Sequence, residues 1–243
     1  EYFYKYGKHE APMRKVAIAL PYKMPDGTMA SRSVTAYFTH HGPVVRAEGG
    51  KWVSVKLMDD PVNALTQSYT RTKARDYNAF YKAMELRTNA SNNTVYADAK
   101  GNIAYFHGNF IPKRDPRVDW TRPVDGSNPA NEWQRLHEID ETITLFNPAS
   151  GYIFNTNNWP CTAAGVSSPK CANYPSYMWS LPENARGRNA ARVFKEAKGL
   201  DIDGLIAASY DTRLQAFEPL VPAVIADYDA LPQEDPRKAA LAE

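Results

Sequence analysis

The stretch Asn93-Thr-Val-Tyr-Ala-Asp-Ala-Lys-Gly-Asn-Ile-Ala-Tyr-Phe-His107 contains the clearest β-sheet pattern in the chain. Two runs rich in β-branched and aromatic residues, 93–98 and 103–107, flank a turn that contains a Gly-Asn pair. Short β-forming runs joined by such a turn are typical of an antiparallel hairpin. The sequence therefore predicts a hairpin here, and the rest of the fold assignment starts from it.

The residues before the hairpin carry strand signals and then helix signals. Short β-branched and aromatic runs predict strands at about 15–20, 33–39, 44–46 and 52–57. Two helices are predicted at about 60–88. The first begins at Asp60-Pro61, where Asp can cap the helix and Pro suits its first turn.

The residues after the hairpin contain long loops and then a helical region. Residues 108–150 are rich in proline and poor in periodic signal, and a short strand is predicted at 152–154. Residues 161–184 are predicted to be loop, and from 185 to 243 apolar residues recur at helical spacing. With 1–160 mainly strands around the two helices, the fold class is α+β, an antiparallel sheet with a helical C-terminal part.

The charge balance argues against two classes of partner. The 243 residues include 29 Lys and Arg against 27 Asp and Glu, a net charge of +2, so we expect no nucleic-acid partner. No apolar run approaches the ~18 residues of a membrane helix, so we expect no membrane partner.

The chain opens at Glu1 without a signal-peptide pattern and ends in a helix-like run, so we expect a piece of a larger polypeptide.

The chain has two cysteines, Cys161 and Cys171, in a loop rich in Pro and Ser. Neither has a His or Cys neighbour at metal-ligand spacing. A disulfide that closes this loop is the favoured interpretation, and two free thiols are the alternative. A disulfide would indicate an oxidising compartment.

The common catalytic signatures are absent, including Gly-x-Ser-x-Gly, His-Glu-x-x-His and the phosphate-binding glycine loops. The pair His40-His41 could hold a metal or act as a general base. Neighbours in a strand point to opposite faces, so we expect the two rings not to share one metal. We interpret His40-His41-Gly42-Pro43 as a bend between strands, and we predict no metal site.

Two further polar residues could carry chemistry. Asn93 could donate a hydrogen bond to a developing oxyanion in acyl transfer, or it could form a turn with Asn92 and satisfy its own backbone; its residue type alone favours the turn. Arg114 could clamp a carboxylate or position a neighbouring amide. The alternative for Arg114 is a surface ion pair with Asp115 or Asp119.

The run Asn155-Thr-Asn-Asn158, followed by Trp159-Pro160, concentrates amide side chains in one loop. Such side chains hydrogen-bond readily to nearby backbone groups. We expect this loop to be rigid and to have a structural role.

Several of these segments resemble motifs of the penicillin acylase family. Tyr37-Phe-Thr-His-His-Gly-Pro-Val-Val45 resembles its Thr-x-His-Gly-Pro-Val-Val strand. The hairpin 93–105 resembles its Asn-x-x-Tyr-Ala-Asp-x-x-Gly-Asn-Ile-x-Tyr motif, and Pro112-Lys-Arg114 matches the Pro-x-Arg that follows. Residues 147–160 match the segment Asn-Pro-x-x-Gly-Tyr-Ile-x-Asn-x-Asn-Asn-x-Pro, and the arginine-rich helix start at 186–192 continues the resemblance.

Members of this family are N-terminal-nucleophile amidohydrolases that mature from a precursor (a zymogen) by self-cleavage. The freed β-chain begins with a Ser that attacks the amide carbonyl, and its own α-amine, with a pKa of about 8, serves as the base. The resemblance implies a partial αββα sandwich. It also implies that Asn93 is the side-chain oxyanion donor and that Arg114 organises the site.

The sequence departs from the family pattern at residue 1, which is Glu and not Ser. We therefore expect residues 1–243 to be a fragment of a β-chain that is inactive alone, with the nucleophile and any calcium-binding carboxylates upstream. Its partners would be the α-chain and the remaining β-chain of the same precursor. No cofactor is expected in this fragment, although calcium is possible in the parent enzyme.

The resemblance implies a small-molecule acyl-amide substrate, of penicillin, N-acyl-homoserine lactone or lipopeptide type, and a periplasmic or secreted location. The Asn155–Asn158 loop and the two cysteines resemble the branch of acyl-homoserine lactone and cyclic lipopeptide acylases. The alternatives are a secreted binding module without catalytic activity and a degenerate acylase homologue with a structural role.

Overall fold

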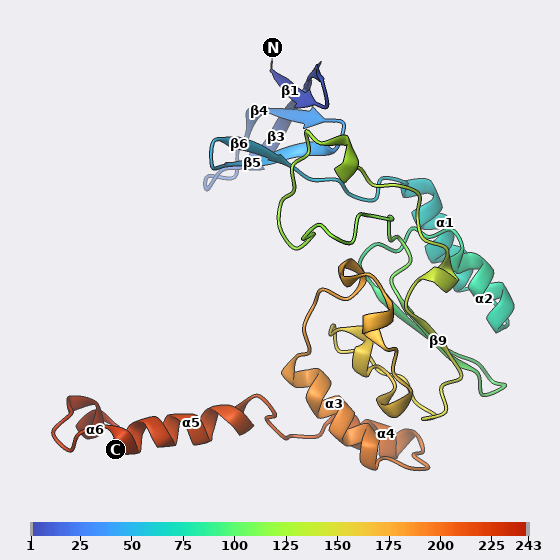
Figure 1. The fold of residues 1–243 in the computed structure, drawn as a ribbon, viewed down its shortest axis with the longest axis vertical. Coiled ribbons are helices and arrows are strands. Elements are labelled where there is room, and N and C mark those ends of the chain that lie inside the picture. The colour runs from blue at the N-terminus through green and yellow to red at the C-terminus, as the bar shows by residue number, and fades with distance from the viewer. Residues whose placement is uncertain (1, 242–243) are drawn as a thin grey trace. The chain divides into compact units, whose positions relative to one another are not determined.

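The computed structural model describes residues 2–241, which form two compact units (Figure 1). The first unit comprises the residues up to Asn92 together with Gly108–Thr142 and Pro175–Met178. The second unit comprises Asn93–His107, Ile143–Tyr174 and the residues from Trp179 onward. Each unit therefore combines segments that are distant in the sequence.

The first unit contains the N-terminal strands. Strands β1 (Phe3–Tyr6) and β2 (His9–Pro12) form a two-stranded sheet. A four-stranded antiparallel sheet follows in chain order, and its strands are β3 (Arg14–Lys23), β4 (Met29–Thr39), β5 (Gly42–Glu48) and β6 (Lys51–Ser54). The predicted strands are present, although β3, β4 and β5 are longer and β6 is shorter than the sequence indicates.

Two helices follow the sheet, α1 (Pro61–Arg71) and α2 (Tyr77–Met84). The Asp60 carboxylate accepts a hydrogen bond from the backbone N–H of Asn63 at 3.2 Å, and Pro61 occupies the first turn. Asp60 therefore caps α1, because its side chain satisfies one of the N–H groups left free at a helix start. The helix start predicted at Asp60-Pro61 is confirmed.

The second unit is built on a three-stranded antiparallel sheet in the order β7 (Asn93–Ala97), β8 (Ile103–His107) and β9 (Thr144–Phe146). Pairing of β7 with β8 confirms the predicted hairpin. The Asp98 carboxylate closes its turn by accepting hydrogen bonds from the backbone N–H groups of Lys100 and Asn102, at 2.9 and 3.0 Å. The central strand β8 supplies the core residues Ala104, Tyr105 and Phe106, all buried.

The short strand predicted at 152–154 is wrong, because the third strand lies earlier, at Thr144–Phe146. Phe154 donates its backbone N–H to the carbonyl of Ala163, at 2.9 Å, and not to a neighbouring strand. The rings of Tyr152 and Phe154 stack on Phe194, with centroids 5.1 and 5.7 Å away. The apolar pattern at 152–154 therefore reflects packing against a helix.

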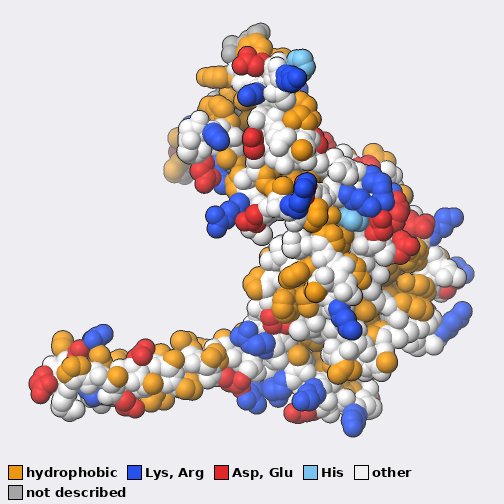
Figure 2. Space-filling model, viewed as in Figure 1, with side chains coloured by type: hydrophobic (Ala, Val, Ile, Leu, Met, Phe, Trp, Pro, Cys, Tyr) orange, Lys and Arg blue, Asp and Glu red, His pale blue; other side chains and the backbone are white. Residues whose placement is uncertain are grey.

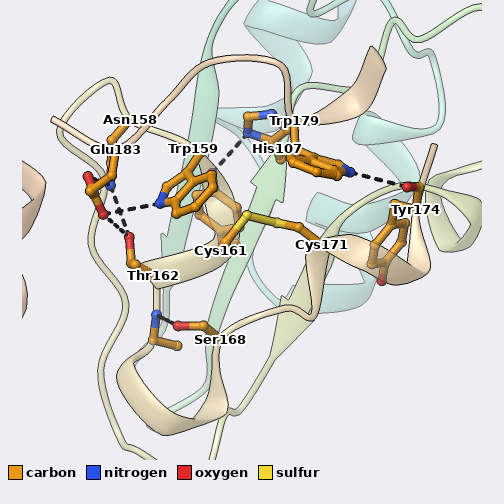
Figure 3. The surroundings of a disulfide bond; sticks show 12 residues. His107, Asn158, Trp159, Cys161, Thr162, Ser168, Cys171, Tyr174, Trp179 and Glu183 are labelled. Atoms are coloured by element: carbon orange, nitrogen blue, oxygen red, sulfur yellow. Dashed lines mark hydrogen bonds between the residues drawn. A yellow bond between two sulfur atoms is a disulfide. The ribbon is translucent and has the colours of Figure 1, made fainter. Parts of the chain in front are cut away.

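Residues 155–184 form short 3₁₀ turns joined by irregular backbone, with Cys161 and Cys171 bonded as a disulfide (Figure 3). The carboxylate of Glu183 accepts hydrogen bonds from the side chains of Asn158, Trp159 and Thr162. Burial opposes ionisation of Glu183, but these hydrogen bonds outweigh it and lower its pKa. Asn158 is buried and bonded at both ends of its amide, so the structural role predicted for this loop is confirmed.

The C-terminal region is helical, as the sequence predicts. Its helices are α3 (Ala185–Glu196), α4 (Ile202–Ser209), α5 (Phe217–Ala230) and α6 (Pro236–Ala240). Apolar side chains of α5 are exposed along its length (Figure 2). No helix among residues 2–241 is both long and apolar enough to cross a membrane. The combination of helices and antiparallel sheets confirms the α+β class.

The connection from β4 to β5 depends on Gly42, whose φ of +132° is one that side-chain-bearing residues rarely adopt. A Cβ atom at this position would lie 2.1 Å from the carbonyl oxygen of Val55. The chain can therefore fold back on itself at this point only because residue 42 has no side chain.

We expect Gly42→Ala to lower the free energy of unfolding by roughly 2–5 kcal/mol, since backbone strain adds to displacement of the Val55 segment. Gly50→Ala is the matched control, because Gly50 also has a positive φ, +74°, but no atom within 4 Å of its missing Cβ. Its expected loss is only about 1–2 kcal/mol. Urea unfolding of both variants checks this, and equal losses would show that the Val55 contact is unimportant.

Candidate functional site

Asn93 is the first residue of β7, and it pairs with His107 of β8. Its side chain is half-buried. Among residues 2–241 the amide of Asn93 makes no hydrogen bond, so both of its N–H groups and its oxygen are uncommitted. An amide fixed at a strand end and not used by the fold can donate to a ligand.

The turn that precedes β7 is closed by other residues. Asn89 donates its side-chain N–H to the carbonyl of Asn92, at 2.7 Å, and accepts the backbone N–H of Asn92, at 3.2 Å. The turn role that the sequence allows for Asn93 is thus carried by Asn89. This observation removes the main structural reason for an Asn at position 93.

The strand beside Asn93 carries a part-buried polar pair. Tyr105 is fully buried, and its hydroxyl shares a hydrogen bond with Nδ1 of His107, at 3.1 Å. Burial raises the pKa of Tyr105, although a hydrogen bond with Asn155 acts in the opposite direction. The phenol therefore stays protonated at neutral pH, and its hydrogen bond restrains the His107 ring that lies two residues further along β8.

Arg114 lies in the first unit, and aromatic rings surround its guanidinium group. The guanidinium carbon is 4.8 Å from the ring centre of Tyr177, 5.4 Å from that of Trp120 and 5.8 Å from that of Trp133. All three distances lie within the range of a cation–π interaction. The rings restrict the guanidinium to one place without neutralising its charge.

The guanidinium of Arg114 has no acidic partner within residues 2–241. The two carboxylates that the sequence offers are engaged elsewhere, Asp115 with Arg117 at 2.6 Å and Asp119 with Arg122 at 3.7 Å. The surface ion pair considered for Arg114 is therefore wrong. Nε of Arg114 is buried without a hydrogen-bond partner, and burial lowers the pKa of this guanidinium, while Tyr177 opposes the shift.

Tyr177 contacts both Arg114 and His137, and the sequence alone does not predict these contacts. Its hydroxyl shares a hydrogen bond with Nε2 of His137, at 2.9 Å, and accepts a long one, 3.5 Å, from the backbone N–H of Arg114. Tyr177 stands 63 residues after Arg114, in a segment with no periodic signal. Only the tertiary fold brings the two residues together.

The geometry expected for His40 and His41 is wrong. Their ring centres are 3.8 Å apart, and both rings face the Oε1 atom of Glu132, at 2.7 Å from Nε2 of His40 and 3.3 Å from Nδ1 of His41. Strand β4 ends at Thr39, so the alternation of a strand does not apply to the turn that follows. The bend itself is confirmed. Burial lowers the pKa of His41, although the hydrogen bond to the Gly126 carbonyl opposes this.

Comparison with known sequences assigns the chain to a family. Residues 1–243, the whole chain, match the sequence profile of the family described as penicillin amidase. The chain belongs to the penicillin amidase family. Penicillin G acylase from Escherichia coli is 40% identical to it over 68 residues, which are 28% of this chain and 8% of that protein.

A solved penicillin amidase shows the same fold. The thermostable penicillin G acylase from Alcaligenes faecalis aligns with 99% of this chain at a TM-score of 0.69 and 23% sequence identity. The chain spans 42% of that acylase chain. The expected fold, that of the N-terminal-nucleophile penicillin acylases, is confirmed. Asn93 and Arg114 belong to different compact units, and their convergence on one site stays a prediction.

The setting of Arg114 predicts that its charge contributes little to stability. We expect Arg114→Met to keep the free energy of unfolding within about 1 kcal/mol of the wild type, because the lost cation–π contacts and the relieved desolvation oppose each other. Arg117→Met is the matched control, since Arg117 is 87% exposed and paired only with Asp115. A loss above about 2 kcal/mol for Arg114→Met in urea unfolding would make this residue a structural one.

Proposed function

We propose that this chain is part of an acyl-amide hydrolase in which Asn93 stabilises the tetrahedral oxyanion. Membership of the penicillin amidase family supports hydrolysis of an acyl amide. The observation that carries the assignment to Asn93 is its uncommitted amide at the first residue of β7. An oxyanion donor must be held in position and must not already be paired within the protein.

The nucleophile in this proposal is an N-terminal Ser outside the 243 residues. The chain spans only 42% of the acylase chain with which it aligns, so other segments of the enzyme can supply it. The Ser hydroxyl attacks the amide carbonyl while its α-amine takes the proton, and the carbonyl oxygen becomes an oxyanion. Collapse of this intermediate expels the amine, which takes the proton, and water then releases the acyl group as a carboxylic acid.

Arg114 positions the site in this proposal. Its charge is confined by three aromatic rings, and its buried Nε–H has no partner among the described residues. A buried donor of this kind indicates a hydrogen-bond acceptor supplied by another group. A carbonyl or carboxylate has the required chemistry, since a fixed guanidinium orients such groups.

The substrate is a small molecule that carries an acyl chain on an amine-bearing core, of penicillin, N-acyl-homoserine lactone or lipopeptide type. The relatives named above are penicillin G acylases, which supports the first type. The enzyme assembles from this chain and the other chains of one self-cleaved precursor.

The deciding experiment is Asn93→Ala in the full-length enzyme. We expect turnover of an acyl-amide substrate to fall by ~10²–10³, with KM little changed, because this hydrogen bond forms fully only in the transition state. Steady-state kinetics with a chromogenic acyl amide measures both quantities. An unchanged kcat would remove Asn93 from the catalytic machinery.

Asn92→Ala is the matched control, since the adjacent residue uses only its backbone in the hydrogen bonds to Asn89. Its kcat and KM should equal those of the wild type. The isolated 243-residue chain serves as the negative control, because it holds no N-terminal Ser nucleophile. Turnover by this chain, free of host acylase, would require a different nucleophile.

The disulfide supports a periplasmic or secreted location, because such bonds persist in oxidising compartments. When the protein is purified without reductant and then denatured, we expect Cys161 and Cys171 to resist alkylation. They should react only after the disulfide has been reduced. Reduction should lower the free energy of unfolding by ~2–3 kcal/mol in the chain-entropy model. Two thiols that react without reduction, as detected by mass spectrometry, would contradict this location.

A further inference from the structure

A group of metal-ligating side chains lies at the turn between β4 and β5. His40, His41 and Glu132 each offer one ligand atom, and these atoms all lie within 4.8 Å of one another. Glu132 comes from a distant segment of the same unit, directly after a 3₁₀ turn at Pro129–Asn131. None of these residues has a part in the hydrolysis proposed above.

The hydrogen bonds of His41 leave one of its contacts unexplained. Its Nε2 lies 2.8 Å from the carbonyl oxygen of Gly126, which can only accept, so this nitrogen carries the proton. In the neutral ring Nδ1 is then an acceptor, and it faces Oε1 of Glu132 at 3.3 Å. Two acceptors that face each other repel unless a positively charged species lies between them.

His40 completes the same arrangement. Its Nε2 lies 2.7 Å from Oε1 of Glu132, and its Nδ1 shares a hydrogen bond with the hydroxyl of Tyr4 at 2.9 Å. The Tyr4 oxygen also accepts the backbone N–H of His40, at 3.1 Å. Each ring thus has one nitrogen held by an outer partner and the other directed at one carboxylate oxygen, which is how metal-binding histidines are oriented in proteins.

We propose that His40, His41 and Glu132 bind a divalent transition metal ion of the Zn²⁺ type, through Nε2, Nδ1 and Oε1 respectively. Two imidazoles and one carboxylate are a donor set that Zn²⁺ accepts, with the fourth tetrahedral position left to water. Bonds of about 2.0–2.1 Å give ligand–ligand separations of about 3.3 Å, so small side-chain shifts suffice. The His40 side chain is 34% exposed, which gives the ion a path of entry.

Binding rearranges protons without releasing one from the neutral site. The proton on Nε2 of His40 moves to Nδ1, which then donates to the Tyr4 oxygen, and the Tyr4 hydroxyl proton turns to solvent. His41 keeps its proton on Nε2, bonded to Gly126. The ion takes the three lone pairs that remain.

Lys56 opposes the ion and supplies a sharp test. Its Nζ lies 2.9 Å from the other carboxylate oxygen of Glu132, Oε2, so its charge cancels that of the carboxylate. A dication at Oε1 is repelled by this ammonium group. Removal of the Lys56 charge should therefore tighten metal binding. If the cluster were only a set of ion pairs, the same change would weaken the cluster itself.

The experiment is isothermal titration of the full-length, tag-free protein with ZnCl₂. We expect one equivalent to bind in the wild type and to be lost in His40→Ala, His41→Ala and Glu132→Gln. Tyr4→Phe should weaken the affinity by about 10–100-fold, as loss of an outer-shell partner does. Lys56→Met should tighten it by about tenfold or more.

His9→Ala is the control for adventitious binding to exposed histidine, since His9 is exposed and outside the site, and it should bind as the wild type does. Circular dichroism checks folding, and Tyr4→Phe and Lys56→Met keep all three ligands. Substitution by Co²⁺ should give the visible bands of a four-coordinate site. Equal Zn²⁺ binding by the wild type and His40→Ala, weaker binding by Lys56→Met, or no binding by the wild type would each overturn the proposal.

Discussion

The candidate oxyanion donor depends on the pairing of β7 with β8. The register that places Asn93 opposite His107 is set by a turn closed on Asp98, and β8 is buried in the middle of its sheet. A slip of one residue between the two strands would put Asn93 and Tyr105 on opposite faces, since side chains alternate along a strand. Burial of Tyr105 holds β8 in place and the Asp98 turn holds β7 in register with it, so together they fix the position of a side-chain amide that contributes no hydrogen bond to the fold.

The candidate site residues share a feature that folding alone would not favour. The side-chain amide of Asn93 makes no hydrogen bond among the described residues, Arg114 has a buried Nε without a partner, and Nδ1 of His41 faces an acceptor. Polar groups in such positions cost free energy unless they find a partner. Ligand-binding sites contain polar groups of this kind. They lower the stability of the free protein and are retained because they bind another molecule.

Local chemistry explains which parts of the fold were predictable. The hairpin at 93–107 and the Asp60 cap are determined by residues within a few positions of one another, and both are present. The Asn155–Asn158 loop has local hydrogen bonds of the same kind, and Glu183 holds it from 25 positions away. The strand predicted at 152–154 was wrong, because its apolar residues pack on Phe194, about 40 positions later in the chain. Tyr177 and Trp133 beside Arg114 could not be predicted, since nothing in their local sequence marks a contact with an arginine. The catalytic roles of Asn93 and Arg114 rest on the family motifs that contain them.

The histidine pair shows how one backbone constraint produces a cluster that a sequence pattern argues against. The Thr39 hydroxyl accepts the backbone N–H of His41 at 3.2 Å and donates to Ser54 on β6 at 3.1 Å, so the strand ends before the two histidines. Gly42 then lets the Val55 carbonyl approach closely, which requires the backbone to turn at once. With both sides of the turn fixed, the imidazole rings of His40 and His41 have little freedom to separate, and both face the same carboxylate oxygen of Glu132. The same Gly that makes the bend possible therefore places two imidazoles next to one carboxylate, an arrangement that a continuous strand would have prevented.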